Sequence, residues 1–321
     1  MPTFGTVVNP TRQLADYLST HASNSLAQSL IAVATPNFAA QLRDLKSNFP
    51  RLQTVGLATD TVPLGCQRSG FSFLVSELPL HIKSRQELLP DLSRNWSPST
   101  SAFRLTGPAN FDLAVPAANT LFSTGRQAEI YANDDVPLTS LHAEIEETFK
   151  LSHSIKPAKP LTEWLEISGA ADNMLKSLNE KPAAGFLEEK VELMESKDPQ
   201  VFAELESGEM VRVVAGGGGL WSPKASMLVL EAPASPRRGQ MLRFWLQQGT
   251  MSSDLESQLA STTDGVVAEA APVPQTHADE KPYLDYKKNH FLDVFGFGSE
   301  LGFMVGTHKH AIVGESAYFR L

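Results

Sequence analysis

The pattern that most restricts the fold lies between residues 29 and 82, where strand-like and helix-like segments follow one another closely. The apolar run SLIAVATP at 29–36 is typical of a buried strand. Thr35 and Pro36 suit the cap and the first turn of a helix, because a side-chain oxygen and a fixed φ are both favoured there. Apolar residues then recur on one helical stripe, at Phe38, Leu42 and Leu45.

Two further runs complete this segment. LQTVGLATD at 52–60 is typical of a second strand, and the alternation in SGFSFLVSELPLHI at 69–82 indicates a third with one better buried face. The sequence therefore predicts a β-α-β-β unit over 29–82. We expect six of its apolar residues to share one core: Leu30, Val33, Phe38, Leu42, Val55 and Phe73.

The rest of the chain is expected to mix strands and helices. Apolar residues recur at three and four in 138–150, 160–178 and 183–196, which favours helices there. The C-terminal SAYFRL alternates like a strand that closes a sheet. The prediction is a two-part mixed-sheet α/β protein with helices packed on the sheets, divided into an N-terminal part at 1–135 and a C-terminal part at 136–321.

Residues 251–282 differ in composition from their surroundings. Ser, Thr, Ala, Pro and acidic residues dominate, and large apolar side chains are almost absent. Burial in such a segment cannot offset a chain-ordering entropy of about 1–2 kcal/mol per residue. We expect a flexible acidic insertion in the C-terminal part, which could also dock a protein partner.

Charge and composition exclude several classes of function. The chain has 321 residues, is 42% hydrophobic, and carries a formal net charge of −9. Lys and Arg never form a run longer than two, so the electrostatic footprint of a nucleic-acid-binding protein is missing. No run reaches the roughly 18–20 apolar residues of a membrane-spanning helix. We expect no nucleic-acid partner and no membrane partner.

The single cysteine, Cys66, argues against a disulfide framework and against a Cys-rich zinc site. The N-terminus has no basic segment followed by an apolar one, so a secretory leader is not expected. These features predict an intracellular protein, in the cytoplasm or in an organelle.

Four consecutive glycines, Gly216, Gly217, Gly218 and Gly219, stand between two apolar runs and are followed by Trp221. They form neither a P-loop nor a dinucleotide-binding fingerprint, because the required Lys and Ser/Thr or helix do not follow. Two interpretations stay open: a structural turn, or a loop whose backbone N–H groups face a ligand.

A second glycine-rich stretch, FGFGSELGF at 295–303, surrounds Glu300 with glycines and phenylalanines. A carboxylate presented there in a partly desolvated place would have a perturbed pKa. The alternative is a tight turn with an exposed glutamate. The functional interpretation places Glu300 in a site together with residues 216–219 and Trp221.

Other candidate sites are weaker. His308 and His310 point the same way only on a strand, and a zinc shell would need a further ligand such as Glu315, so no metal site is predicted. Cys66 has no nearby histidine, and no G-x-S-x-G motif offers a serine nucleophile. No cofactor is predicted either.

Several of these stretches together resemble the FIST family, the small-ligand sensing domains found beside signalling modules and in some F-box proteins. SLIAVATPNFAAQLRDLKSNFPRLQTVGLATD is similar to the N-terminal strand-helix-strand of the family, and SGFSFLVS to the strand that follows. FGFGSELGF resembles its glycine-glutamate-glycine turn, so that Gly298, Glu300 and Gly302 carry over. The resemblance covers roughly 28–82 and 283–321, and it implies a ligand cleft between two α/β halves and binding rather than catalysis.

The sequence therefore predicts a sensor-like protein that binds a small-molecule ligand. One alternative is an enzyme on the same scaffold, with Glu300 as general acid or base and backbone N–H donors from residues 216–219. Another is an interaction subunit that docks a partner through 251–282. We expect an enzyme to place Glu300 beside a second polar group, a sensor to enclose a pocket with few titratable groups, and an interaction subunit to expose a large apolar patch.

Overall fold

The structure is a computed structural model that describes most of the chain. The described residues are 2–21, 26–63, 67–88, 101–155, 158–188, 190–191, 193, 200–206, 210–216, 226–231, 234–247, 264–271, 290–311 and 314–321.

The fold is mostly β, which corrects the predicted α/β class. Strands account for 53% of the described residues and helices for 12%, and one of the sheets closes into a six-stranded barrel. The prediction failed mainly in the middle of the chain. The segment 138–150, expected to be helical, contains β9 (Leu138–Ile145) and the start of β10 (Lys150–Ile155). The expected helix at 160–178 is replaced by β12 (Leu165–Ala171) and β13 (Met174–Leu178).

The third expected helix, at 183–196, is confirmed in part: α4 (Gly185–Glu188) lies within it, and most of the remainder lies outside the described residues. The reason for these errors is that helical and strand spacing cannot be separated in a short apolar run. In β9 the buried residues are Leu138, Leu141, Ala143 and Ile145. The buried positions are therefore separated by three, two and two residues, and so short a run is compatible with a helix or a strand. Pairing with distant strands determines that the segment is a strand.

The chain forms two compact units. The larger comprises Met1–Ile155, Ser252–Thr307 and Val313–Leu321, and the smaller comprises Lys156–Met251 and His308–Ile312. The chain therefore leaves the first unit near residue 155 and returns to it near residue 252, whereas the sequence analysis placed a single boundary at 135/136.

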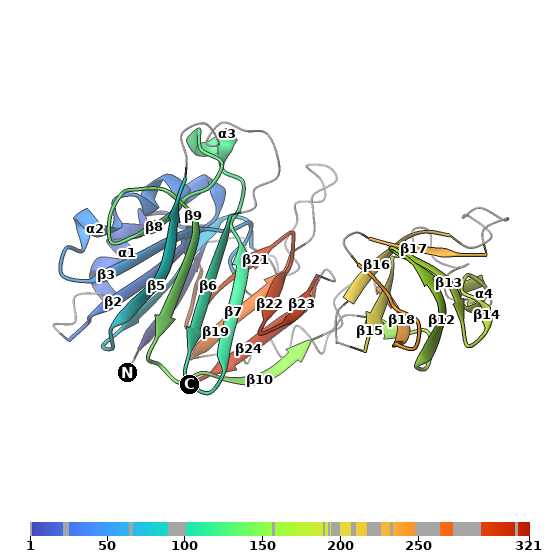
Figure 1. The fold of residues 1–321 in the computed structure, drawn as a ribbon. Helices are drawn as coiled ribbons and strands as arrows, with labels where there is room; N and C mark the ends of the chain where they lie inside the picture. The colour runs from blue at the N-terminus through green and yellow to red at the C-terminus, as the bar shows by residue number, and fades with distance from the viewer. Residues whose placement is uncertain are drawn as a thin grey trace. The chain divides into compact units, whose positions relative to one another are not determined.

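The larger unit begins with a six-stranded sheet, here called sheet A (Figure 1). Its neighbouring strands β2 and β3 are parallel, and the other pairings are antiparallel. In spatial order the strands are β20 (His290–Leu292), β1 (Thr3–Val8), β4 (Gly70–Ser76), β2 (Ser29–Ala34), β3 (Gln53–Ala58) and β8 (Ile130–Ala132).

Short helices cover one face of sheet A. They are α1 (Leu14–His21), the 3₁₀ helix η1 (Pro36–Leu42) and α2 (Leu45–Asn48). Leu14, Leu18 and Leu42 of these helices share a buried cluster with residues of β2 and β4. Thr35 precedes η1 as expected, but its side chain does not cap the helix; its hydroxyl donates to the carbonyl of Gly70 instead.

Two further sheets complete the larger unit. Sheet B has the order β10, β24 (Ser316–Arg320), β19 (Gly265–Ala270) and β21 (Phe295–Ser299), and β19 and β21 are parallel. The third sheet includes β22 (Phe303–Val305), β7 (Phe111–Pro116), β6 (Ala102–Gly107), β9 and β5 (Leu80–Glu87) in that order. The short helix α3 (Leu121–Thr124) lies between β7 and β8 in the chain.

The main core of the larger unit lies between these three sheets. It joins the second face of sheet A, including Ile31 and Val33, to Phe295 and Phe319 of sheet B and to Phe103 of β6. The six residues expected to share one core are consequently divided. Val33 and Val55 face this main core, whereas Leu30, Leu42, Phe73 and the partly buried Phe38 pack on the helix side. Successive residues of a strand point to opposite faces, and sheet A is covered on both.

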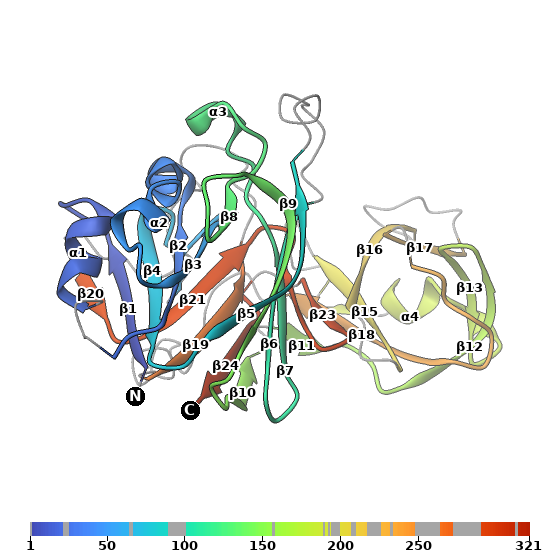
Figure 2. The same cartoon turned by 60° about the vertical axis from the view of Figure 1, so that its left-hand side comes forward.

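The smaller unit contains the closed barrel, which Figure 2 shows close to end-on. Its strands, all antiparallel, are β12, β13, β17 (Leu228–Leu230), β16 (Met210–Gly216), β15 (Val201–Leu205) and β18 (Met241–Gln247), and β15 pairs again with β18 to close the ring. Leu175, Leu242 and Phe244 are among the residues that fill the interior. Three short strands remain among the described residues of this unit. β11 (Ala158–Pro160) pairs with β18, and β14 (Lys181–Pro182) pairs with β13. The third is β23 (His308–His310).

The predicted insertion at 251–282 contains an ordered, buried strand, which is a correction. Residues 265–270 form β19, whose six residues are all buried between β21 and β24. Its sequence GVVAEA is short and follows a polar stretch, so the average composition of the segment concealed it. The flanking parts, 251–263 and 272–282, lie outside the described residues.

Candidate functional site

The chemically most distinctive cluster lies where the chain leaves β3 and β21 of the larger unit. Thr61, three residues beyond β3, pairs with Gly298 of β21 through two backbone hydrogen bonds, of 3.2 Å and 2.9 Å. The Thr59 hydroxyl donates to the carbonyl of Thr61 at 2.9 Å and stiffens the turn. This pairing brings the ends of two strands from different sheets together, although they are far apart in sequence.

Three charged side chains meet at this junction, and we call them the Asp60 cluster: Asp60, Arg68 and Glu300. The backbone N–H of Glu300 donates to Asp60 Oδ2 at 2.9 Å. Arg68 Nη1 lies 2.8 Å from Glu300 Oε1, and the two side chains are only 21% and 25% exposed. The cluster therefore holds two carboxyl groups and one guanidinium in a partly desolvated place.

Asp60 is the perturbed group of the cluster. Burial raises the pKa of its carboxyl from 3.8 to about 6, and the nearby Glu300 carboxylate acts in the same direction. The backbone N–H of Glu300, the Ser299 hydroxyl and Arg68 oppose this shift of the Asp60 pKa without cancelling it. A carboxyl group with such a pKa changes its charge close to neutral pH, which is a property of many functional acids.

Gly298 and Gly302, on either side of Glu300, are each favoured as glycine for a different structural reason. Gly302 has a positive φ of 79°, a conformation that side chains with a Cβ rarely adopt. Gly298 has no such φ, but an added Cβ would come within 2.1 Å of Thr61 Oγ1. The sequence analysis assigned both glycines to ligand binding; the geometry accounts for them through the turn and through the packing of Thr61.

Replacing Gly298 with alanine should therefore destabilise the protein by about 1–3 kcal/mol, the usual cost of overpacking. The double variant Gly298→Ala with Thr61→Ala should recover part of that loss, because Thr61 Oγ1 is the atom that the new methyl group meets. Urea unfolding of the two single variants and the double variant measures this coupling. Strictly additive effects would contradict the proposed contact.

The predicted site residues are only partly described. Glu300 lies in the Asp60 cluster beside two polar groups, the arrangement that the sequence analysis associated with an enzyme. Gly216 is the last residue of β16 in the smaller unit, has a φ of 120°, and pairs with Leu228. Gly217, Gly218, Gly219 and Trp221 lie outside the described residues, as does Cys66. That residues 216–219 lie beside Glu300 therefore stays a prediction.

Asp60 and Arg68 were not among the residues predicted from the sequence to form a site. The available signal for Asp60 was its position two residues after a buried strand, where polar side chains often reach a sheet edge. Arg68 carried no signal of its own, since it meets Glu300 across 232 residues of chain.

A second polar cluster is buried beside the end of β3. The Tyr131 hydroxyl donates to Glu129 Oε2 and accepts a hydrogen bond of 2.9 Å from Arg126 Nη1. Burial, followed by the hydrogen bond to Glu129, raises the pKa of the Tyr131 hydroxyl. The carbonyl of Glu129 accepts from the N–H of Ala58 at 2.9 Å, so this cluster anchors β8 against β3. The cluster thus adjoins the end of β3, from which Asp60 follows.

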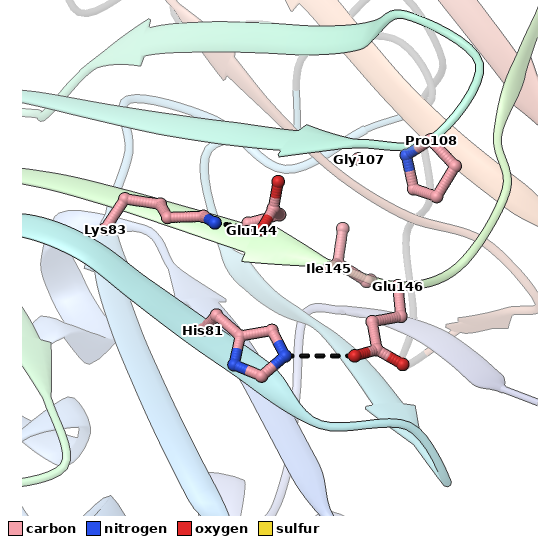
Figure 3. A pocket seen from close by; sticks show the side chains of 7 residues that line it. All are labelled: His81, Lys83, Gly107, Pro108, Glu144, Ile145 and Glu146. Atoms are coloured by element: carbon pink, nitrogen blue, oxygen red, sulfur yellow. Dashed lines mark hydrogen bonds and ion pairs between the residues drawn. The ribbon is translucent and has the colours of Figure 1, made fainter.

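A cavity of about 430 Å³ lies on another surface of the larger unit, between β5, β9 and the β6–β7 turn (Figure 3). Its lining residues are His81, Lys83, Gly107, Pro108, Glu144, Ile145 and Glu146. His81 Nε2 lies 3.0 Å from Glu146 Oε1, and Lys83 pairs with Glu144. Both basic side chains that line the cavity are therefore engaged with acidic ones.

The described residues contain no group of three or more His, Cys, Asp or Glu side chains that could hold a metal ion. Among the described helices, none has both the length and the apolar character needed to cross a membrane. Comparison with family models, curated proteins and solved structures gives no match.

Proposed function

We propose that the larger unit binds a small molecule at the Asp60 cluster, and that the ligand places a cationic group, such as an ammonium, against Asp60 and Glu300. The observation that carries this proposal is the Asp60 carboxyl, which is held partly buried beside a second carboxylate at a cost in stability. Ionisable groups that the fold holds in poorly solvated places, where their charged form is unfavourable, are concentrated at functional sites.

The charge balance of the cluster supports a cationic ligand. Two carboxyl groups face one guanidinium, and Arg68 is engaged with Glu300 at 2.8 Å. An ammonium near Asp60 would replace the missing positive charge and favour the ionised carboxylate. The resemblance of the 295–303 turn to the FIST family also points to small-ligand binding.

Binding of amines is the expected result when the full chain is screened by thermal shift and titration calorimetry. The probes are small primary amines and their N-acetylated counterparts, which lack the positive charge. Amines should bind at pH 7.5 and bind more weakly at pH 5, where Asp60 is protonated. Asp60→Asn should weaken binding by at least about tenfold, the effect of losing one charge-assisted contact.

Asp44→Asn is the matched control, because Asp44 is an exposed carboxylate outside the cluster. It should leave amine binding unchanged. The proposal is wrong if no amine of the set binds, if the acetylated compounds bind as well as the amines, or if Asp60→Asn and Asp44→Asn behave alike.

A second candidate is acid–base catalysis at the same cluster, and the raised pKa of Asp60 favours it. A carboxyl with a pKa of about 6 exchanges protons more readily near neutral pH than an ordinary aspartate. This candidate shifts the acid–base role from Glu300, as first predicted, to Asp60. Turnover of a bound amine, followed by NMR, should then disappear in Asp60→Asn; an amine that binds and stays unchanged indicates binding alone.

A further inference from the structure

The outer face of the barrel in the smaller unit carries a separate group of charged and aromatic side chains. In β15 and β18 alternate residues point outward, because Ala203, Leu205 and Phe244 fill the interior. The strand register sets Phe202 opposite Trp245 and Glu204 opposite Arg243 on the outer face. Trp164, which directly precedes β12, adds a second indole near Arg243.

Arg243 is held rigidly at the centre of this group. Its Nε donates to Glu204 Oε2 at 2.6 Å, and the same oxygen accepts from Trp245 Nε1 at 2.8 Å. The guanidinium carbon lies 4.7 Å from the ring centre of Trp164 and 4.5 Å from that of Trp245. Contacts of this kind fix a long side chain in one conformation, so less entropy is lost when it binds a partner.

The arrangement leaves part of the guanidinium available. A guanidinium has five N–H donors, and the recorded bond to Glu204 uses the one on Nε. The Arg243 side chain is 30% exposed and Trp164 is 39% exposed. A preorganised pair of Nη donors beside an exposed indole fits a carboxylate that is followed by an apolar group.

We propose that this face, formed by Arg243 and Trp164 over Glu204 and Trp245, docks an acidic peptide segment of a protein partner. A Glu or Asp carboxylate of the segment binds the Nη groups of Arg243, and a neighbouring apolar side chain packs on Trp164. Arginine and tryptophan are also the residues that most often dominate the affinity of protein interfaces.

Charge favours a peptide over a nucleic acid. The chain carries a net charge of −9 and has no run of basic residues longer than two, whereas nucleic-acid binding relies on several phosphate contacts. A single oriented guanidinium, with its Nη groups beside the exposed Trp164, suits one carboxylate in a mixed acidic and apolar segment.

The test is fluorescence anisotropy on the full chain with two fluorescein-labelled octapeptides. One contains two glutamates among leucine and phenylalanine residues, and the other has glutamine in place of glutamate. The glutamate peptide should bind at least about tenfold more tightly than the glutamine peptide, because a charged acceptor strengthens the bond to arginine. Arg243→Lys should remove that advantage, and Trp164→Ala should weaken the binding of both peptides, because it removes the apolar contact that they share.

Arg238→Lys is the matched control, since Arg238 is an exposed arginine of the same unit that makes only a long contact of 3.9 Å to Glu180. Arg243→Lys keeps a cation beside the buried Glu204 carboxylate, and near-UV circular dichroism verifies that both variants are folded. Equal affinity for the two peptides, no binding of the glutamate peptide, or unchanged binding in Arg243→Lys would overturn the proposal. Binding of a thymidine oligonucleotide that is lost in Arg243→Lys would assign the face to nucleic acid instead.

Discussion

Asp60→Asn is expected to stabilise the protein at pH 7.5 by about 2–3 kcal/mol and to leave its stability near pH 4 almost unchanged. The value follows from a pKa raised from 3.8 to about 6, at about 1.4 kcal/mol for each pKa unit. Asparagine retains an oxygen that can accept the 2.9 Å hydrogen bond from the Glu300 N–H, but it carries no charge to desolvate.

The direction of the pH dependence follows from proton binding. Between pH 4 and 6 the folded protein keeps the Asp60 proton that the unfolded chain has already lost. The free energy of unfolding of the natural protein should therefore fall over this interval as pH rises, and Asp60→Asn should lack this fall. Above about pH 7 Asp60 is ionised in both states, so the difference between the two proteins becomes constant.

Urea unfolding of the natural protein, Asp60→Asn and the control Asp44→Asn at half-unit steps from pH 4 to 8 measures this effect. The exposed control should differ from the natural protein by less than about 0.5 kcal/mol throughout. Parallel stability curves for the natural protein and Asp60→Asn would show that Asp60 has an ordinary pKa, and would contradict a functional role for its carboxyl group.

Leu42→Ala should destabilise the protein by about 2–5 kcal/mol, the range found for truncating a buried leucine. Leu42 ends η1 and is fully buried in the cluster between the short helices and sheet A. Its Cβ lies close above Gly56 of β3: a methyl group placed on Gly56 would be 3.2 Å from it. Because Gly56 has no side chain that could move into the space, the cavity should persist and the cost should be in the upper part of the range.

Leu151→Ala provides the comparison for Leu42→Ala. Leu151 lies on β10 and is half exposed, so its truncation should change the free energy of unfolding by less than about 1 kcal/mol. Both values come from midpoints of urea unfolding with the slope checked for constancy. A loss below 0.5 kcal/mol for Leu42→Ala would mean that η1 is not packed on sheet A as the structure shows.

The local pattern of the N-terminal segment was sufficient to predict much of its structure. Strands were expected at 29–36 and 52–60, and β2 and β3 lie within those limits. Thr35 and Pro36 correctly indicated where a helical segment begins, although it is a short 3₁₀ helix. These features depend on residues close in sequence, and buried apolar runs, proline geometry and helical stripes report them directly.

The candidate site was only partly accessible in the same way. Glu300 could be singled out because glycines and phenylalanines surround it. Asp60 becomes distinctive only when Glu300 lies beside it, and 240 residues separate the two. The pKa of Asp60 is raised by burial and by the nearby Glu300 carboxylate, so no local sequence pattern around Asp60 could indicate it.

By itself, the sequence determined where apolar residues must be buried and where the first strands and the first helical turn form, because those choices are made by neighbouring residues. Tertiary structure alone decided that β9, β10, β12 and β13 pair as strands, that β19 inside a polar segment becomes an inner strand of a sheet, and that β15 closes a barrel on β18. The physical reason is that a strand gains its hydrogen bonds from partners distant in sequence, whereas a helix finds them within one turn.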